Sequence, residues 1–330
     1  MREISLVVKT LLRIALTAVV LWTAASAFAQ TYPNRPIRVI VNFPGGGNVD
    51  NIVRLMTAQL EPQMGVTFVV DNRAGANGII GAEIAAKALP DGYTLLFSPS
   101  SVAVNQVTYS KIPYDVLKDF APITNACAGS GYVLVIHPSV PARTLKELIA
   151  LGKNKAKPLT YGTPGQGNPQ HFLGEFFNLR TGTQMVHVPY KGVTQQLIGV
   201  LGGEIAVVFA PPLAVAPHMT SGKLRAIAFT GAARWNGMPE LPTVAESGYP
   251  DFAWRTGWQG WFAPARTPTE IVTRLNQEVR RALEVPKVKE TLAAGGYEVI
   301  ADSPAEFRRF IESELKRYAE VARKAGIKFD

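Results

Sequence analysis

The stretch that decides the fold reads Phe43-Pro44-Gly45-Gly46-Gly47-Asn48-Val49-Asp50. An apolar run at residues 37–41 comes before it and is typical of a buried strand. After it, apolar residues recur at helical spacing as far as Leu60 and predict one face of a helix. A turn between a strand and a helix leaves backbone N–H groups pointing outward at the positive end of the helix dipole, which suits an anion. The same pattern also occurs in turns that bind nothing.

The chain repeats this pattern at residues 164–168. Four letters recur in the same order, and Pro44, Gly45, Gly47 and Asn48 correspond to Pro164, Gly165, Gly167 and Asn168. Each copy continues with a strand, a turn, a helix and another strand, at residues 67–97 and 184–209. This order predicts two α/β lobes, each a mostly parallel sheet flanked by helices. Ligands of such sheets bind at the carboxyl ends of the strands, where both corners lie. Chance similarity of four positions is the alternative.

Residues 1–29 have the pattern of a secretory signal peptide. A positive front with Arg2 and Lys9 precedes an apolar run at residues 14–22, and Ala27-Phe28-Ala29 matches a cleavage site. The apolar run is too short to span a bilayer comfortably, so we favour a cleaved signal over an uncleaved membrane anchor. We therefore expect an exported, periplasmic protein.

The composition excludes several classes of function. The formal net charge of +9 favours anionic partners. The cationic residues form no stripe with interleaved aromatic rings, so we do not expect a nucleic-acid partner. The single cysteine, Cys127, excludes an intramolecular disulfide and lies in an apolar context typical of a core residue. The sequence contains no G-x-S-x-G, no H-E-x-x-H and no Cys/His cluster, and neither corner has the ending of a phosphate loop. We therefore expect no catalytic residue, no metal site and no cofactor.

The chain is expected to cross between the lobes twice. The first lobe comprises residues 30–125 and 255–330, and the second comprises residues 126–254. The return crossing is rich in tryptophan (Trp254, Trp258 and Trp261), which we interpret as hinge packing, with one ring in the cleft as the alternative. The C-terminal helices are expected to pack on the first lobe. Three hydroxyl residues are predicted to cap helices: Thr144, Thr267 and Ser303.

The sequence resembles the Bug-type periplasmic solute receptors of tripartite tricarboxylate transporters. Beyond the first corner, the resemblance rests on ordered motifs that cover essentially the whole mature chain, among them Asp71-Asn72-Arg73, Pro90-Asp91-Gly92-Tyr93, His187-Val188-Pro189-Tyr190-Lys191-Gly192 and Pro242-Thr243-Val244. It implies a two-lobe periplasmic-binding-protein (Venus flytrap) fold that closes on a small carboxylate and presents it to a membrane permease. We expect a monomer that is not an enzyme.

The resemblance also implies which positions bind the ligand. In the family, backbone amides of the first corner hold one carboxylate, and the second lobe selects the other end. The first role falls on Phe43, Gly46, Gly47, Asn48 and Asp50. The second falls on Gly165, Gly167, Asn168 and His171, with Tyr190 and Lys191 at the next corner. We add Ser98, whose hydroxyl follows a strand of the first lobe, and Ala210, which stands where the family often has Asp.

Three departures from the family pattern make the expected pocket less polar. Val49 replaces a common Thr, Asn168-Pro169-Gln170 replaces a hydroxyl-rich loop, and Ala210 replaces the Asp. These changes favour an aromatic or longer-chain carboxylate over an amino acid or citrate. Two alternative functions stay open. One is a periplasmic hydrolase of a small anionic ester with His171 as its base, and the other is a ligand-sensing receptor for a sensor kinase.

Overall fold

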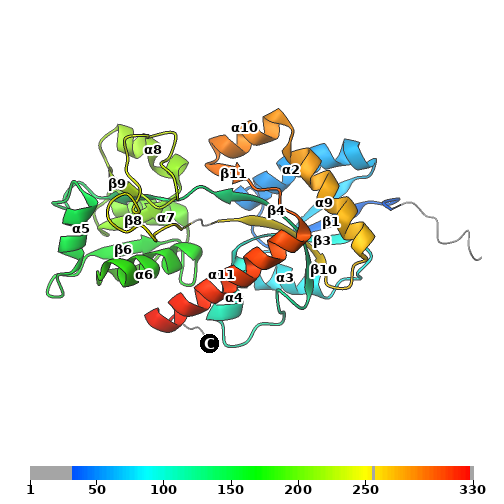
Figure 1. Ribbon diagram of the computed structural model, residues 1–330, viewed down its shortest axis with the longest axis horizontal. Helices are drawn as coiled ribbons and strands as arrows, with labels where there is room; N and C mark the ends of the chain where they lie inside the picture. The colour runs from blue at the N-terminus through cyan, green and yellow to red at the C-terminus, as the bar shows by residue number, and fades with distance from the viewer. Residues whose placement is uncertain (1–31, 255–256, 328–330) are drawn as a thin grey trace, which may run out of the picture.

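Two α/β lobes lie side by side in the computed structural model, which describes residues 32–254 and 257–327 (Figure 1). The predicted signal peptide lies outside these residues. Lobe 1 is built on a six-stranded sheet and lobe 2 on a five-stranded sheet. None of the helices in the described part of the chain is long and apolar enough to cross a membrane.

Lobe 1 has the strand order β11-β4-β10-β3-β1-β2. Its strands are β1 (Ile37–Val41), β2 (Phe68–Asn72), β3 (Thr94–Pro99), β4 (Phe120–Gly129), β10 (Gln259–Pro264) and β11 (Tyr297–Val299). The helices are α2 (Asn48–Met64), the short η1 (Ala76–Gly78), α3 (Ile79–Ala86), α4 (Ser101–Thr108), α9 (Thr269–Leu283) and α10 (Pro286–Ala294). Strands β1, β2 and β3 are parallel, whereas β10 is antiparallel to both β3 and β4.

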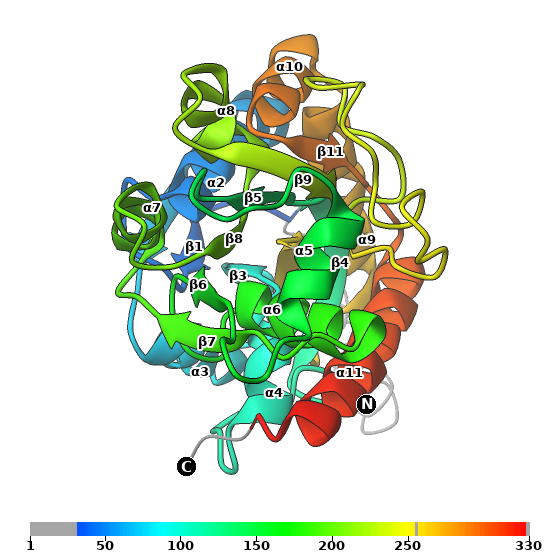
Figure 2. The ribbon, with the colours of Figure 1, turned by 90° about the vertical axis from the view of Figure 1, so that its left-hand side faces the viewer.

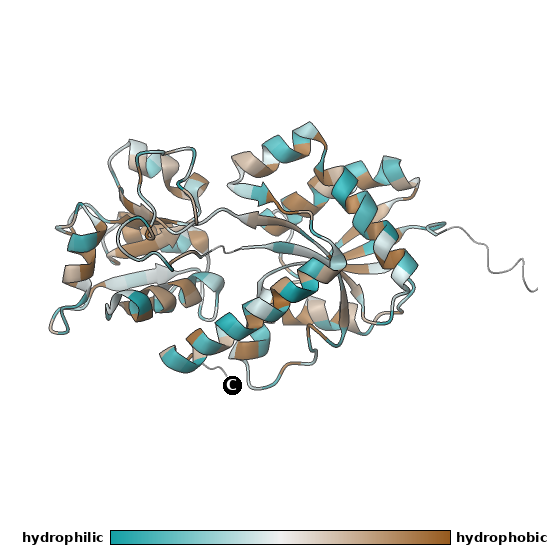
Figure 3. Ribbon diagram, in the orientation of Figure 1, coloured by the Kyte–Doolittle hydropathy of each residue, from teal (hydrophilic) through white to brown (hydrophobic). Residues whose placement is uncertain are grey.

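Both faces of the lobe 1 sheet are covered, because its strands are apolar on both sides. Leu95 and Phe97 point into a core shared with α2, α9 and α10. Leu96, between them, points into a second core shared with α3 and α4. This alternation follows from the two-residue period of a strand. Figure 3 shows the apolar residues gathered on the strands and on the helix faces that cover them.

Lobe 2 has the strand order β7-β6-β8-β5-β9. Its strands are β5 (Val133–Ile136), β6 (Thr160–Thr163), β7 (Val186–Pro189), β8 (Val207–Ala210) and β9 (Arg225–Phe229). The helices are α5 (Leu145–Gly152), α6 (Pro169–Thr181), α7 (Val193–Leu201) and α8 (Pro212–Thr220). Only β5 runs against the other four strands, since β6, β7 and β8 are parallel and both β8 and β9 are antiparallel to β5. Helices α5 and α6 share one core with the sheet, and α7 and α8 share the other.

The two sheets repeat one arrangement, which confirms the predicted pair of similar lobes. In lobe 1 the order β2-β1-β3 is followed by the antiparallel β10, and in lobe 2 the order β7-β6-β8 is followed by the antiparallel β5. β10 and β5 are each the first strand after the chain crosses from the other lobe.

The last helix, α11 (Pro304–Ala325), spans both lobes (Figure 1). Phe307 and Ile311 in its first half pack into the core of lobe 1. Tyr318 and Val321 in its second half pack into the core of lobe 2. The expectation that the C-terminal helices pack on the first lobe therefore holds only for part of α11. Its hydrophobic stripe is longer than lobe 1 can cover.

The tryptophans of the return crossing are core residues. Trp254, Trp258 and Trp261 are at most 1% exposed, which supports hinge packing and contradicts a cleft-lining ring. Where the chain enters lobe 2, Gly131 lies against Gly231, and a Cβ on Gly131 would sit 2.5 Å from the Gly231 nitrogen. The two segments can approach this closely only because both residues lack a side chain.

Two of the three predicted helix caps are present. Thr144 and Ser303 each form a capping box, with Glu147 and Glu306 respectively. The prediction for Thr267 is wrong, because its hydroxyl donates to the Pro264 carbonyl and α9 begins only after Pro268.

We predict that Tyr318→Ala destabilises the protein through lobe 2. The Tyr318 ring lies 5.5 Å from Phe172 and 6.1 Å from Trp254, so its removal leaves a cavity between α11 and lobe 2. The free energy of unfolding should fall by about 3–5 kcal/mol. Denaturant unfolding followed by tryptophan fluorescence measures this. The exposed Lys316→Ala on the same helix should change it by no more than about 0.5 kcal/mol, and an equal effect of both variants would contradict the packing described.

Candidate functional site

The predicted binding corners lie at the carboxyl ends of parallel strands. In lobe 1, Val41 at the end of β1 is in register with Asn72 at the end of β2 and with Phe97 on β3. The loops that follow these strands therefore meet at one edge of the sheet. We call residues 43–50 the first corner and residues 164–171 the second corner.

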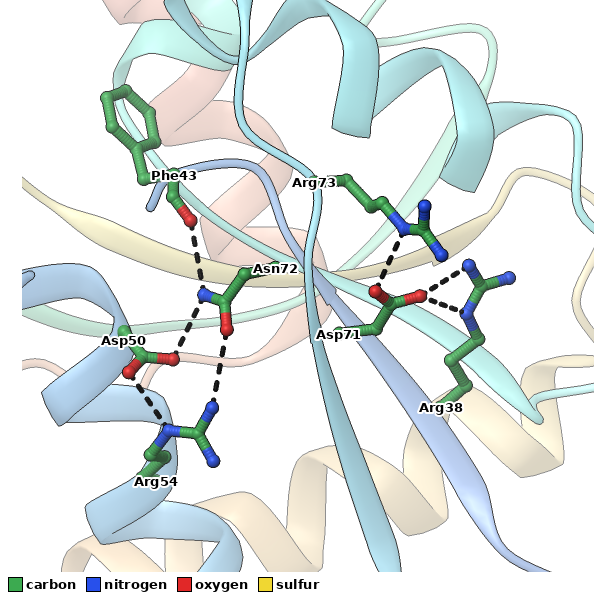
Figure 4. Close-up of polar contacts among 7 residues, drawn as sticks. All are labelled: Arg38, Phe43, Asp50, Arg54, Asp71, Asn72 and Arg73. Carbon is green, nitrogen blue, oxygen red and sulfur yellow. Dashed lines mark hydrogen bonds and ion pairs between the residues drawn. The ribbon is translucent and has the colours of Figure 1, made fainter. Parts of the chain in front are cut away.

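A buried carboxylate braces the first corner (Figure 4). Asp50, in the first turn of α2, is 3% exposed. One oxygen accepts hydrogen bonds from the Gly46 N–H and from Arg54 Nε, both at 2.9 Å. The other accepts from Asn72 Nδ2 at 3.0 Å, and the same amide nitrogen donates to the Phe43 carbonyl at 3.1 Å. Asn72 thus ties the end of β2 to both ends of the glycine-rich loop.

The charge of Asp50 is held in place by these donors. Burial by itself raises the pKa of this carboxyl, but the hydrogen bonds from Arg54, Gly46 and Asn72 outweigh it and lower the pKa below its usual value. Beside it, Asp71 bridges Arg38 and Arg73 (Figure 4). There too the two guanidiniums outweigh the effect of burial, and the pKa of Asp71 is lowered. The corner therefore rests on two ionised carboxylates.

The N-terminus of α2 carries no side-chain cap. Gly47 is its N-cap residue and has no side chain with which to cap the helix. The Asn48 amide, which belongs to the next residue, donates instead to the Tyr297 hydroxyl on β11. Residues 44–48 are all exposed. Gly47 and Asn48 thus lie exposed at the positive end of the helix dipole, where no N-cap side chain accepts a first-turn N–H.

Two predicted positions of the first corner have partners within the corner. The prediction for Asp50 concerns its backbone amide, and its carboxylate is buried and faces the loop backbone. The Gly46 N–H, which was expected to bind the ligand, is donated to Asp50. Gly46 has a φ of +75°, a left-handed turn that glycine adopts without strain.

At the second corner, backbone N–H groups donate to side chains of the corner itself. Asn168 is the N-cap of α6, and its side-chain oxygen accepts the Gln170 N–H at 2.9 Å. The Gly167 N–H donates to His171 Nδ1 at 3.2 Å. Gly165 supplies a carbonyl that accepts the Thr163 hydroxyl at 2.9 Å. Gly167 and His171 are both buried, so this corner offers far fewer free N–H groups than the first.

The structural equivalence of the two corners differs by one residue from the alignment of their repeated sequence letters. The left-handed glycine is Gly46 in the first corner and Gly167 in the second, and the N-cap is Gly47 in the first and Asn168 in the second. The repeat aligned Gly47 with Gly167 instead. This shift places a side chain with a hydrogen-bond acceptor at the N-cap of α6, where α2 has none.

His171 is part of a stacked histidine pair. Its ring lies 3.7 Å from that of His187, at an interplanar angle of 13°. Since His171 Nδ1 accepts from Gly167, its proton is on Nε2. The Thr163 hydroxyl lies 2.9 Å from the Gly165 carbonyl oxygen and 2.6 Å from His187 Nε2, and so links the second corner to His187. Burial, with a contribution from His187, lowers the pKa of His171 to about 3, and burial lowers that of His187 to about 4. Both rings are neutral near neutral pH.

Three other predicted positions have packing contacts or hydrogen bonds within their own lobes. Ser98 and Ala210 are completely buried, and the Ser98 hydroxyl is bonded to Asn42 and to the Pro99 carbonyl. The Tyr190 ring fills the space beside Gly162 and Gly199, which leaves no room for a Cβ at either glycine. Burial, with a contribution from Glu204, raises the pKa of Tyr190. Lys191, by contrast, is exposed at the start of α7.

Some functional residues were not predicted from the sequence. Asn72 and Arg54 hold the first corner, and Asn72 belongs to a recognised motif whose role was not assigned. Tyr297 fixes Asn48 across 249 positions of sequence, a separation that gives no local signal. In lobe 2, α8 begins with Pro211 at its N-cap and Pro212 at its first position. Two prolines there remove N–H donors from the helix start.

The starts of α2 and α8 lie on the same side of the molecule. Tyr297 contacts Asn48 of the first corner, and its neighbour Gly296 lies against α8. A Cβ added to Gly296 would sit 3.7 Å from Cδ of Pro212. The two lobes therefore approach each other beside the first corner.

Comparison with known proteins agrees with this architecture. The family model described as the tripartite tricarboxylate transporter family receptor matches residues 52–327. Over 307 residues the chain is 39% identical to protein BugT of Bordetella pertussis, which covers 92% of this chain and 94% of that protein.

Solved structures give the same result. R. palustris Rpa4515 with adipate has a TM-score of 0.78 at 33% identity, covering 90% of this chain and 99% of that one. The periplasmic binding protein BugD has a TM-score of 0.75 at 30% identity, with the same coverage. These likenesses confirm the expected two-lobe periplasmic-binding-protein fold.

We predict that the histidine pair makes the protein sensitive to mild acid. In the unfolded chain both imidazoles take up protons below about pH 6.5, whereas in the folded protein they stay neutral down to about pH 4. Their contribution to stability is therefore complete above pH 6.5 and is lost as the pH falls toward 4.

The double variant His171→Gln/His187→Gln should show a flatter dependence of Tm on pH in this window. Asp302, whose pKa burial raises to about 6, has the opposite effect in both proteins, so the difference between them reports the histidines. His218→Gln on α8, outside the second corner, is the control. The same slope in the double variant and the native protein would contradict the assignment.

Proposed function

Because the chain belongs to the receptor family of tripartite tricarboxylate transporters, we propose that it is a periplasmic solute-binding protein that captures a small carboxylate between its lobes. The observation that carries this proposal is the uncapped, exposed N-terminus of α2, held in shape by the buried Asp50. A carboxylate there would accept hydrogen bonds from first-turn amides and be stabilised by the helix dipole. Gly47, Asn48 and the neighbouring Phe43 are the positions we assign to this contact.

The arginine side chains beside the first corner are already paired with other residues of lobe 1. Arg54 donates to Asp50 and to Asn72, while Arg38 and Arg73 pair with Asp71. Each of these guanidiniums therefore supports the loop rather than standing free for a ligand. Backbone amides supply the recognition that an arginine supplies in many other carboxylate sites.

The far end of the ligand faces a lobe with few donors. At the second corner the amides of Gly167 and Gln170 are taken by His171 and Asn168. The start of α8 carries two prolines and the half-exposed Leu213. This supports an aromatic or longer-chain carboxylate over citrate or an amino acid, since the third carboxylate of citrate or the ammonium group of an amino acid would meet few prepared partners there. Rpa4515, a relative of this chain, was solved with adipate.

The proposal also covers the export of the protein and the delivery of its ligand. We infer that residues 1–29 are a cleavable signal peptide and that the monomer delivers its ligand to a membrane permease of a tripartite transporter. A receptor that reports to a sensor kinase would bind the same ligand in the same way. Transport measurements in a permease deletion separate these two roles.

The hydrolase alternative is disfavoured by the geometry of His171. A general base needs a free nitrogen within hydrogen-bond reach of a substrate proton. His171 is 7% exposed, and its unprotonated nitrogen already accepts the Gly167 N–H. We therefore assign His171 to the architecture of the second corner.

We predict that carboxylates stabilise the mature protein against heat. A ligand at a hundredfold excess over Kd adds about 2.7 kcal/mol to the free energy of unfolding. Thermal shift with adipate and benzoate should exceed that with citrate and glutamate at equal concentration, because the lobe 2 side offers few partners for the third carboxylate of citrate or for the ammonium group of glutamate. A shift with inorganic phosphate alone, and with no carboxylate, would overturn the proposal.

We predict that Gly46→Val abolishes carboxylate binding and leaves the protein folded. The valine would project into the open space at the first corner, where a Cβ meets no atom within 4 Å. It would also strain the left-handed turn by about 1–2 kcal/mol. Gly65→Val is the matched control, because Gly65 has a φ of +68° and equally open surroundings at the other end of α2. Equal ligand affinity in the two variants, measured by calorimetry, would remove the first corner from the site.

A further inference from the structure

Lobe 2 has a large groove at the end of its sheet remote from the corners. The groove has a volume of about 770 Å³ and lies between the start of β9, the start of α5 and the loop at residues 238–247. Strands β8 and β9 run in the same direction, since both are antiparallel to β5. Arg225, the first residue of β9, therefore lies at the opposite end of the sheet from Ala210, the last residue of β8.

The groove lies along the outer edge of the lobe 2 sheet. β9 is the outermost strand of lobe 2. The loop after β9 covers this edge at one residue, where the Phe229 N–H donates to the Pro242 carbonyl and the Phe229 carbonyl accepts the Val244 N–H. Over residues 225–227, no other segment of the described chain pairs with that edge. An unpaired strand edge is a template for an extended segment of another chain.

The walls of the groove favour a particular chemistry. Leu224 and Met238 give it an apolar lining. Arg143 and Lys146 lie at its rim, both exposed and without an ion-pair partner among the residues that the structure describes. The nearby Arg234, by contrast, is already paired with Glu246 at 2.8 Å.

A third cation completes the positive rim. Arg225 Nη1 donates to the carbonyls of Val140 and Ala142, at 3.3 and 3.0 Å, and so has a fixed position beside the edge. Glu240 is the one acidic side chain in the lining. The balance of charge around the groove is positive and would attract an acidic partner.

We propose that this groove docks an extended acidic segment of a partner protein, which pairs with β9 as an added strand. Main-chain hydrogen bonds to the open edge would supply affinity, while Leu224 and Met238 receive alternate apolar side chains and the rim cations meet the acidic ones. Figure 2 shows that β9, α5 and the loop after β9 belong to the face of lobe 2 turned away from lobe 1. Docking there leaves the first corner free, so this proposal does not rest on the carboxylate function.

The test uses a short fluorescent peptide that alternates glutamate and valine. Fluorescence anisotropy with the mature protein measures its affinity, and a lysine-and-valine peptide of the same length is the comparison. The acidic peptide should bind, should slow the hydrogen exchange of residues 225–227, and should bind more weakly as salt rises. In Arg143→Glu/Lys146→Glu its affinity should fall by about tenfold or more.

Charge-matched controls keep the result interpretable. Lys155→Glu/Lys287→Glu reverses two exposed charges outside the groove and should leave peptide affinity unchanged. The melting temperature of each variant reports whether it is still folded. No binding of the acidic peptide at about 1 mM, equal binding of the lysine peptide, or protection confined to residues outside 225–227 would each overturn the proposal. Competition by inorganic phosphate without any backbone protection would indicate a simple anion site instead.

Discussion

The bonds from Gly46, Arg54 and Asn72 to the buried carboxylate of Asp50 are the interaction on which the first corner depends. Three consecutive glycines give this loop more backbone freedom than three residues with side chains would. Asp50 restricts the loop by accepting the Gly46 N–H. Asn72 restricts its other end by donating to the Phe43 carbonyl. The loop therefore loses its conformational entropy when the protein folds, and ligand binding does not have to order it.

The two lobes share a topology but differ in the backbone N–H donors that their helix starts offer. A glycine at the N-cap of α2 leaves its first amides open, whereas an asparagine at the N-cap of α6 accepts one, and His171 accepts another. The prolines at the start of α8 remove further donors. In the proposed binding mode, lobe 1 provides the anion site and lobe 2 provides a surface with fewer free donors. α11 packs into both cores and connects these two surfaces mechanically.

Much of this architecture could be predicted from the sequence, because each strand and helix carries its own period of apolar residues. The order of elements in the two lobes and the caps at Thr144 and Ser303 depend on local patterns and were predicted correctly. The repeat was also found, but its letters align the two corners one residue away from their structural equivalents. The contacts of Asp50 and His171 could not be predicted, because their partners are brought together by strand register. Asn72 reaches Asp50 only because β1 and β2 pair with Val41 opposite Asn72. The contact between Asn48 and Tyr297 spans 249 positions of sequence, and no local pattern signals it.

An amide NMR titration with adipate tests the central claim most directly. The account predicts that the backbone N–H resonances of Gly47, Asn48 and Val49 move as the carboxylate binds, while those of Gly167 and Gln170, already bonded within lobe 2, keep their hydrogen-bond partners and move little. Large shifts at the second corner with the first corner unchanged would contradict the account and place the carboxylate in the other lobe.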